Sequence, residues 1–183
     1  MSLRPDKSIS RVTPITVHTW SRYGAIGALR AAGLSAGAGS VTWVANSAVY
    51  IPLFLPFPYV INRLCWVNGG TITSSNVDCG LYDFNGNLIV KSGSVAMASS
   101  NALQFASLST PIVIPMGSYY MGWWCNNTTS RAYGLAISAT FGRMGGLLQQ
   151  ASLTSGLPST MTPAAYSPLG YVPCGISRTI TGW

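Results

Sequence analysis

The stretch Ser118–Cys125 reads SYYMGWWC and has the clearest β-strand pattern in the 183-residue chain. Its side chains divide between two alternating faces: Tyr119, Met121, Trp123 and Cys125 on one, and Tyr120, Gly122 and Trp124 on the other. Successive side chains of a strand point to opposite sides of a sheet, so both sides carry aromatic residues here. We therefore expect a central strand that is buried on both faces, or one whose second face meets a partner.

Further short apolar runs, separated by turn residues, lie on both sides of this stretch. Those rich in β-branched, aromatic or alternating apolar residues cover residues 49–55, 59–67, 77–82, 88–91, 103–105, 112–114 and 133–141. Asn85-Gly86 predicts a two-residue hairpin turn, and Pro52 places the first run at a sheet edge or a bend. Regular short strands with turns between them predict an all-β, antiparallel β-sandwich.

The composition changes on either side of the strand-rich region, which predicts three parts. These are an N-terminal basic arm (1–44), a β-sandwich domain (45–141) and an extended C-terminal segment (142–183). The arm holds five of the ten basic residues, and its glycine-rich end at 35–40 predicts a flexible hinge. The C-terminal segment mixes prolines with apolar residues, so we expect it to lie extended on a neighbour or back on the sandwich.

Acid and base groups are scarce. The chain has three acids (Asp6, Asp78 and Asp83), no glutamate and a single histidine, His18. Catalysis needs proton-transfer groups, activated nucleophiles or metal ligands. His18 lies in the arm, apart from Asp78 and Asp83 in the strand-rich region. The sequence therefore predicts a protein that is not an enzyme, with no catalytic residue, cofactor or metal site.

Asp78 and Asp83 remain the best candidates for a cation site, because they flank Gly80-Leu81-Tyr82. Two carboxylates are few for calcium, and aspartate commonly hydrogen-bonds the backbone at the start of a turn. We therefore expect Asp83 to open the Asn85-Gly86 turn instead. The four cysteines, at positions 65, 79, 125 and 174, lack the close pairing of zinc ligands and predict single buried thiols.

Charged residues make up 7% of the chain, against about 25% in a typical soluble domain. Such a surface must be largely apolar or merely polar, which predicts burial against other copies, with a trimer favoured, or against other proteins. The net charge of +7 suggests docking on an acidic partner through basic residues of the arm: Arg4, Lys7, Arg11, Arg22 and Arg30.

Nucleic acid is a minor alternative as that partner, since the sequence has no run of adjacent Lys or Arg. No apolar run reaches the length of about 18 residues that a membrane span needs, and the first residues are polar rather than signal-like. We therefore expect neither membrane insertion nor secretion.

Aromatic residues are the strongest binding candidates. Alternation places one of Trp123 and Trp124 inward, so the other needs a covering element or a partner. Exposed aromatic rings suit stacking on sugars and the centres of protein interfaces. The candidate glycan or interface residues are Tyr120, Trp124, Asn126 and Asn127.

Several short motifs follow one another between Val77 and Leu135, a region of about a third of the chain. They are VDCGLYD (77–83), NGNL (85–88), LSTP (108–111), IPMGSYYMGWW (114–124) and NNTT (126–129). This pattern resembles a jelly-roll-like β-sandwich module of bacteriophage virion proteins, found in tail fibres, adhesins and capsid-surface proteins. The resemblance implies that fold and a place in the virion more firmly than a particular task.

Together these observations predict a non-enzymatic bacteriophage virion structural protein, displayed on the particle exterior as a homo-oligomer. It would serve as a capsid decoration or cement protein or as a short fibre, with other virion proteins as partners. The alternative is a tail or baseplate receptor-binding module that recognises host-cell carbohydrate. A secreted lectin-like protein is a third alternative. The lack of a signal-like segment among the first residues argues against it.

Overall fold

The computed structural model describes residues 38–129, 131–135, 146–163, 165–166 and 174–177. All regular secondary structure in these ranges is β-strand. The strands are β1 (Ala38–Thr42), β2 (Ser47–Leu55), β3 (Tyr59–Val67), β4 (Asn76–Asp83), β5 (Leu88–Lys91), β6 (Val95–Ala96), β7 (Leu103–Ile114), β8 (Gly117–Cys125), β9 (Arg131–Leu135), β10 (Leu148–Gln150), β11 (Ala165–Tyr166) and β12 (Cys174–Ser177).

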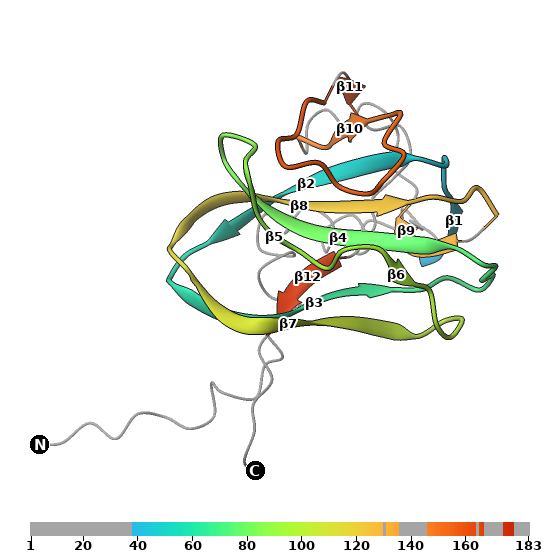
Figure 1. The fold of residues 1–183 in the computed structure, drawn as a ribbon, viewed down its shortest axis with the longest axis horizontal. Helices are drawn as coiled ribbons and strands as arrows, with labels where there is room; N and C mark the ends of the chain where they lie inside the picture. The colour runs from blue at the N-terminus through green and yellow to red at the C-terminus, as the bar shows by residue number, and fades with distance from the viewer. Residues whose placement is uncertain (1–37, 130, 136–145, 164, 167–173, 178–183) are drawn as a thin grey trace, which may run out of the picture.

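The strands form two main sheets and a short ribbon (Figure 1). The larger, seven-stranded sheet has the order β11-β10-β2-β8-β4-β5, and β6 also pairs with β4. The smaller sheet has the order β12-β3-β7, and the ribbon pairs β1 with β9. Every pairing is antiparallel, so the all-β antiparallel prediction is confirmed.

An apolar core, here called the inner cluster, joins the two main sheets. The larger sheet contributes buried residues of β2, β4 and β8, and the smaller sheet contributes buried residues of β3 and β7. Its fully buried members include Val49, Ile51, Leu53, Ile61, Leu64, Trp66, Val77, Cys79, Leu81, Met121 and Trp123. Burying apolar area between two sheets is the main stabilising contribution in such a sandwich.

Strand β8 lies where the sequence predicted, in the middle of the larger sheet between β2 and β4. Its odd-numbered residues, from Tyr119 to Cys125, belong to the inner cluster. The Trp123 ring meets Trp43 edge to face, with centroids 4.4 Å apart. Trp43 Nε1 donates a hydrogen bond to the carbonyl oxygen of Ser47 over 3.0 Å, which satisfies its buried polar atom.

Strand β1 corrects the predicted hinge at residues 35–40. Residues 38–40 belong to β1, which is hydrogen-bonded to β9 with Ala38 opposite Leu135 and Ser40 opposite Tyr133. Small residues can adopt a flexible coil, but they can equally pair in a sheet when a partner strand is available. Composition alone could not separate these two outcomes.

The turn after β4 is longer than two residues, so the predicted two-residue turn is wrong. Residues 84–87 connect the strands, and Gly86 N donates to the Asp83 carbonyl oxygen over 3.1 Å. Gly86 alone of these four has a positive φ, of 86°. A two-residue type I′ turn needs positive φ at both central residues, whereas a type I turn followed by a left-handed glycine needs only one.

Pro52 lies inside the larger sheet, although proline favours sheet edges. Strand β2 pairs with β8 along its whole length, and Pro52 stands opposite Tyr120. On its other side β2 pairs with β10 only from Ala48 to Tyr50. Pro52 therefore lies where β2 has one neighbouring strand, so its missing N–H interrupts no ladder on the second side.

Three cysteines, Cys65, Cys79 and Cys125, are buried thiols, as predicted for these positions. Burial raises the pKa of the Cys125 thiol and keeps it protonated. Within the described ranges, no helix has the length and apolar character that crossing a membrane requires.

Candidate functional site

A segment after β10 covers the outer face of the larger sheet (Figure 1). We call residues 153–162 the strap. Beneath it lies a second apolar group, the outer cluster, whose buried members are Ala48, Tyr50, Tyr82, Trp124 and Leu157. This is one of the two positions that the sequence left open for the C-terminal segment, and here the segment lies back on its own sandwich.

Leu157 occupies a socket formed by two glycines. Gly80 of β4 and Gly122 of β8 are directly paired across the strands. A Cβ atom on Gly80 would lie 2.9 Å from Leu157 Cδ1, and one on Gly122 would lie 3.2 Å from Leu157 Cδ2. Any larger residue at either position would push the leucine out, so the sheet accepts the strap because both positions are glycine.

Asp78 anchors the strap from inside the sheet. Its side chain is 1% exposed, and its Oδ2 accepts a hydrogen bond from Leu157 N over 3.0 Å. Ser92 Oγ donates to Asp78 Oδ1 over 3.1 Å. Lys91 Nζ lies 3.5 Å from Asp78 Oδ2 and donates to the Leu157 carbonyl oxygen over 2.6 Å. This buried carboxylate is therefore paired and hydrogen-bonded, as burial of a charge requires.

Backbone conformation at Gly156 lets the strap approach Asp78. Gly156 has a φ of 100°, in the region that glycine adopts most readily, and a Cβ there would lie 2.8 Å from Asp78 Oδ2. The Asp78 carboxylate is therefore in direct contact with the backbone of the strap.

Two tyrosines hold the strap and the strand before it. Tyr82 Oη donates to the Pro158 carbonyl oxygen over 2.7 Å, and Tyr50 Oη donates to Gln150 Oε1 over 2.8 Å. Their rings meet edge to face with centroids 5.3 Å apart. Desolvation by burial raises the pKa of both hydroxyls well above the usual value of 10.0, and for Tyr82 the nearby Tyr50 and Asp78 raise the pKa further.

Trp124 is not an exposed binding residue, because the strap covers it. The side chain is 2% exposed, and its Nε1 donates to the Leu153 carbonyl oxygen over 2.8 Å. The sequence required a covering element or a partner for one tryptophan of the pair, and the chain supplies the covering element itself. Of the aromatic binding candidates on β8, Tyr120 alone remains partly accessible.

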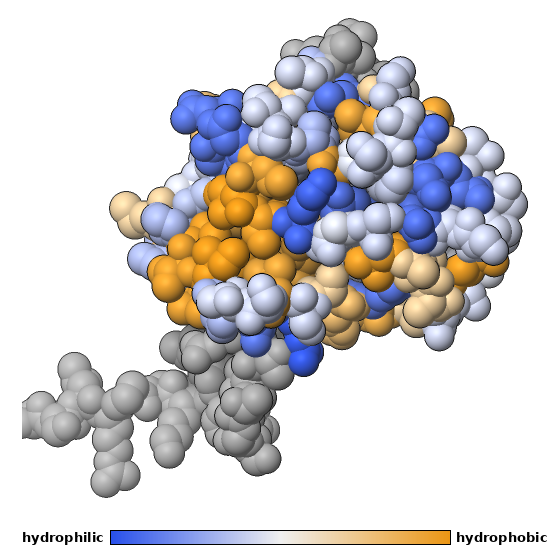
Figure 2. Space-filling view, viewed as in Figure 1, coloured by the Kyte–Doolittle hydropathy of each residue, from blue (hydrophilic) through white to orange (hydrophobic). Residues whose placement is uncertain are grey.

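Tyr120 and residues near it form an exposed apolar patch at one end of the larger sheet. The Phe84 ring stacks on Tyr120 at a centroid distance of 6.2 Å and an angle of 17°. Phe54 lies on the neighbouring strand β2, opposite Ser118, and Met116 lies in the turn just before β8. We call Phe54, Phe84, Met116 and Tyr120 the apolar patch. Figure 2 shows apolar surface gathered on this face, over the region where β2 ends and β8 begins.

Sequence reasoning did not single out Phe54 or Phe84. A usable signal was present at Phe84, because an aromatic residue between Asp83 and Asn85 stands inside a predicted turn. A turn projects from the sheet, so such a side chain has few neighbours to cover it.

The predicted polar residues Asn126 and Asn127 hold their own loop in place. Asn126 Oδ1 accepts a hydrogen bond from Asn76 N over 2.9 Å, and Asn126 N donates to the Asn76 carbonyl oxygen over 3.1 Å. Asn127 Oδ1 accepts from Thr129 N over 2.5 Å. These contacts join the loop after β8 to the start of β4.

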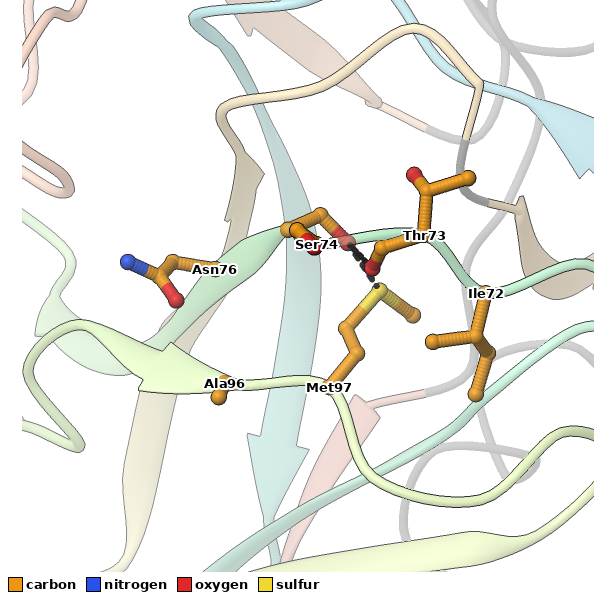
Figure 3. Close-up of a pocket in the computed structure, with 7 residues that line it drawn as sticks. Ile72, Thr73, Ser74, Asn76, Ala96 and Met97 are labelled. Atoms are coloured by element: carbon orange, nitrogen blue, oxygen red, sulfur yellow. Dashed lines mark hydrogen bonds between the residues drawn. The ribbon is translucent and has the colours of Figure 1, made fainter.

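An open hollow of about 700 Å³ lies beside this junction (Figure 3). It is lined by residues of the loop before β4 and of β6: Ile72, Thr73, Ser74, Ser75, Asn76, Ala96 and Met97. Ser75 Oγ donates to Met97 Sδ over 3.1 Å. None of these seven residues is titratable, so the hollow offers neutral hydrogen-bonding groups beside apolar atoms and suits an uncharged polar ligand.

The two sandwich aspartates serve separate structures, so the calcium alternative is not supported. Asp83 is half-buried, and its Oδ1 and Oδ2 accept from Asn87 N over 2.8 Å and from Asn87 Nδ2 over 3.1 Å. These hydrogen bonds lower the pKa of Asp83, and the prediction that it opens the turn is confirmed. Among the described residues, no group of three or more His, Cys, Asp or Glu side chains could hold a metal ion.

His18 and the arm residues predicted to dock on a partner lie outside the described residues: Arg4, Lys7, Arg11, Arg22 and Arg30. Comparison with known proteins gives no further guide. No protein-family model matches the chain, and no curated protein matches its sequence.

Proposed function

We propose that this chain is a non-enzymatic bacteriophage virion structural protein, displayed on the particle exterior as a homo-oligomer. In that setting it serves as a capsid decoration or cement protein or as a short fibre. The observation that carries the proposal is the amount of exposed apolar surface. Within the described ranges, nine large hydrophobic side chains are exposed: Val44, Phe54, Phe57, Phe84, Ile89, Leu103, Phe105, Val113 and Met116. Surfaces of this kind favour lasting contact with neighbouring proteins.

The arrangement of the virion-module motifs supports the proposal. The VDCGLYD motif forms most of β4 and the SYYMGWW motif forms most of β8. These strands are neighbours, in register from Val77 opposite Cys125 to Asp83 opposite Tyr119. The two motifs therefore build one structural unit at the centre of the larger sheet. We propose a jelly-roll-like sandwich on the same basis.

The use of charged groups also favours a structural role. Asp78 and Lys91 bind the strap, and Asp83 holds the turn after β4. Each carboxylate in the described part thus has hydrogen-bond partners within the fold. Acid–base catalysis requires a group that is free to exchange a proton with substrate, and neither carboxylate is placed for that task.

Quantitative mass spectrometry of the source particle tests the proposal, with the major shell protein as the internal standard. A copy number comparable to that of the shell protein is expected for a decoration or cement protein. A copy number comparable to that of tail proteins would place the chain in a fibre or the baseplate. Absence from purified particles would contradict the virion proposal.

A receptor-binding module that recognises host carbohydrate is the second candidate, and the hollow beside Asn76 favours it. Its lining of hydroxyl and amide groups with apolar atoms matches what an uncharged sugar requires. Ser74→Trp would fill the hollow, whereas Ser109→Trp on the exposed face of β7 is the matched control. Loss of binding to a glycan array with Ser74→Trp but not with Ser109→Trp would establish this function, and no binding by the unmodified chain would reject it.

A further inference from the structure

We infer that Asn85 is a site of spontaneous deamidation, and that this reaction loosens the neighbouring end of the strap. The chain contains two Asn-Gly pairs, Asn68-Gly69 and Asn85-Gly86. Asparagine followed by glycine is especially prone to deamidation, because glycine has no side chain to hinder attack by its own backbone nitrogen. The structure places the two pairs in opposite environments, so it distinguishes the pair that reacts from the pair that does not.

The reaction needs only water as a co-reactant. The backbone nitrogen of Gly86 gives up its proton to solvent and attacks Cγ of Asn85, and the side-chain amide group leaves as ammonia. This intramolecular attack is favoured because the two groups belong to adjacent residues. Water then opens the resulting succinimide ring at either of its carbonyl groups, which yields aspartate or isoaspartate. The net change is the addition of water and the loss of ammonia.

Asn85 lies in the loop between β4 and β5, where its side chain is exposed. Water therefore reaches the reacting amide, and ammonia leaves freely. Turn contacts oppose the reaction, since Gly86 N donates to the Asp83 carbonyl oxygen over 3.1 Å and the Asp83 carboxylate accepts from backbone amides of the same loop. Contacts at the tip of a hairpin open locally without unfolding of the sheet, so these slow the reaction without preventing it.

Asn68 is the internal comparison, because its side chain is held on every side. It is 0% exposed. Its Oδ1 accepts a hydrogen bond from Trp66 Nε1 over 3.0 Å, and its Nδ2 donates to the Ser99 carbonyl oxygen over 3.1 Å and to Gln104 Oε1 over 2.8 Å. Attack on this amide would break all three hydrogen bonds in a place that water does not reach.

The loop that contains Asn85 lies directly against the strap (Figure 1). Met161 N donates to the Gly86 carbonyl oxygen over 2.8 Å, and Leu88 N donates to the Ser159 carbonyl oxygen over 2.8 Å. The contact is close, since a Cβ on Gly86 would lie 2.9 Å from Met161 Cγ. Isoaspartate at position 85 adds a methylene group to the backbone immediately before Gly86. The Gly86 carbonyl group is thereby displaced from Met161 N.

Both products also add a carboxylate to a loop that already holds one. The Asp83 carboxylate is fixed at this loop by hydrogen bonds from Asn87. The nearby cation of the hairpin, Lys91, is already engaged by Asp78 and by the Leu157 carbonyl oxygen. Repulsion between two carboxylates in the loop therefore opposes the loop conformation to which the strap binds.

Peptide mapping by mass spectrometry tests the site on the full-length chain, incubated in its folded state at mildly alkaline pH. Deamidation raises the mass of a peptide by about one dalton, and electron-transfer fragmentation distinguishes isoaspartate from aspartate. We expect Asn85 to react at least about 100-fold faster than Asn68, because opening three side-chain hydrogen bonds reduces the reactive population by about that factor. No reaction at Asn85, or equal rates at the two positions, would overturn the inference.

Limited proteolysis of the incubated chain tests the effect on the strap. Asn85→Gln is the matched variant, because it keeps the side-chain amide but forms the corresponding ring far more slowly. We expect cleavage within residues 153–162 to increase several-fold as isoaspartate accumulates in the unmodified chain, and to stay constant in Asn85→Gln. Equal cleavage of the two proteins after conversion at position 85 would overturn the link to the strap. Circular dichroism checks the fold, and Asn85→Ser replaces Asn85→Gln if that variant misfolds.

Discussion

The two faces of the larger sheet solve the same burial problem in different ways. The inner face packs on a second sheet, and its cluster consists almost entirely of apolar side chains. The outer face packs on a strap without regular secondary structure, and its cluster is rich in tyrosine and tryptophan whose polar atoms bind that strap. A coil segment exposes its own backbone polar groups, so a face covered by one must offer hydrogen bonds as well as apolar area.

The sharpest test of this comparison removes one leucine from each cluster. Leu64 is 0% exposed in the inner cluster and Leu157 is 2% exposed in the outer one. We expect Leu64→Ala and Leu157→Ala each to lower the free energy of unfolding by about 3 kcal/mol. On the sheet side the socket of Leu157 is formed by Gly80 and Gly122, which have no side chains to move into the cavity, so only neighbours such as Tyr82 and Leu88 could fill it.

Urea denaturation followed by tryptophan fluorescence measures both variants. Gly122→Ala combined with Leu157→Ala is the informative control, because the added methyl group enters the vacated socket. A cost below about 1 kcal/mol for Leu157→Ala would mean that the strap is a passive cover.

The second prediction concerns the polar half of the outer contact. Asp78→Asn keeps the size of the side chain, but it removes the charge near Lys91 and turns one acceptor into a donor facing Leu157 N or Ser92 Oγ. We expect a loss of about 2 kcal/mol in the free energy of unfolding, together with faster proteolysis within the strap. Denaturation and limited proteolysis measure the two effects.

Asp83→Asn is the matched control for Asp78→Asn, since Asp83 is a less buried carboxylate of the same strand. The lowered pKa of Asp83 contributes stability that is present at neutral pH and is lost as the pH falls through the folded-state pKa. The cost of Asp83→Asn should therefore become smaller as the pH falls. Strap proteolysis unchanged by Asp78→Asn would show that the glycine socket and the other hydrogen bonds hold the strap without this carboxylate.

The third prediction concerns the effect of alkaline pH on the stability that the tyrosines of the outer cluster contribute. The pKa values of Tyr50 and Tyr82 are raised in the folded protein above the usual 10.0. The unfolded chain therefore ionises these groups first, and the stability they contribute is complete below pH 10 and falls as the pH rises towards the folded-state values. We expect each of the two tyrosines to contribute a loss of about 1 kcal/mol per pH unit in this range.

Thermal melts of the unmodified chain and of Tyr50→Phe and Tyr82→Phe, taken at a series of alkaline pH values, measure this effect. Each phenylalanine variant should start less stable near neutral pH and lose less stability as the pH rises. Parallel pH profiles for all three proteins would show that other groups control alkaline unfolding.

The sequence predicted the inner face of the larger sheet better than it predicted the outer face. Alternation in Ser118–Cys125 was enough to predict a strand with one of Trp123 and Trp124 facing inward, because a period of two is a local property of the backbone. The fate of Trp124 could not be predicted in this way. It depends on Leu153, and the pairing of a strand residue with a distant coil residue leaves no periodic pattern.

The socket shows a further limit of sequence reasoning. Gly80 and Gly122 are informative only as a pair, and they become a pair only through the register between β4 and β8. Asp78 is similar, because its burial follows from where the strap lies rather than from its neighbours in sequence. The turn after β4 was located correctly but assigned the wrong length, since Asn-Gly also fits a loop whose only left-handed residue is the glycine.

The position of the strap after the strands in chain order has a consequence for biosynthesis. Strands β2, β4 and β8 are all translated before Leu157, so they can pair while Tyr50, Tyr82 and Trp124 still lack their cover. During that interval the nascent sheet presents an aromatic surface of the kind that chaperones bind and that promotes aggregation. Arrival of the strap closes this surface, so the aromatic face is shielded only after residues 153–162 have been synthesised.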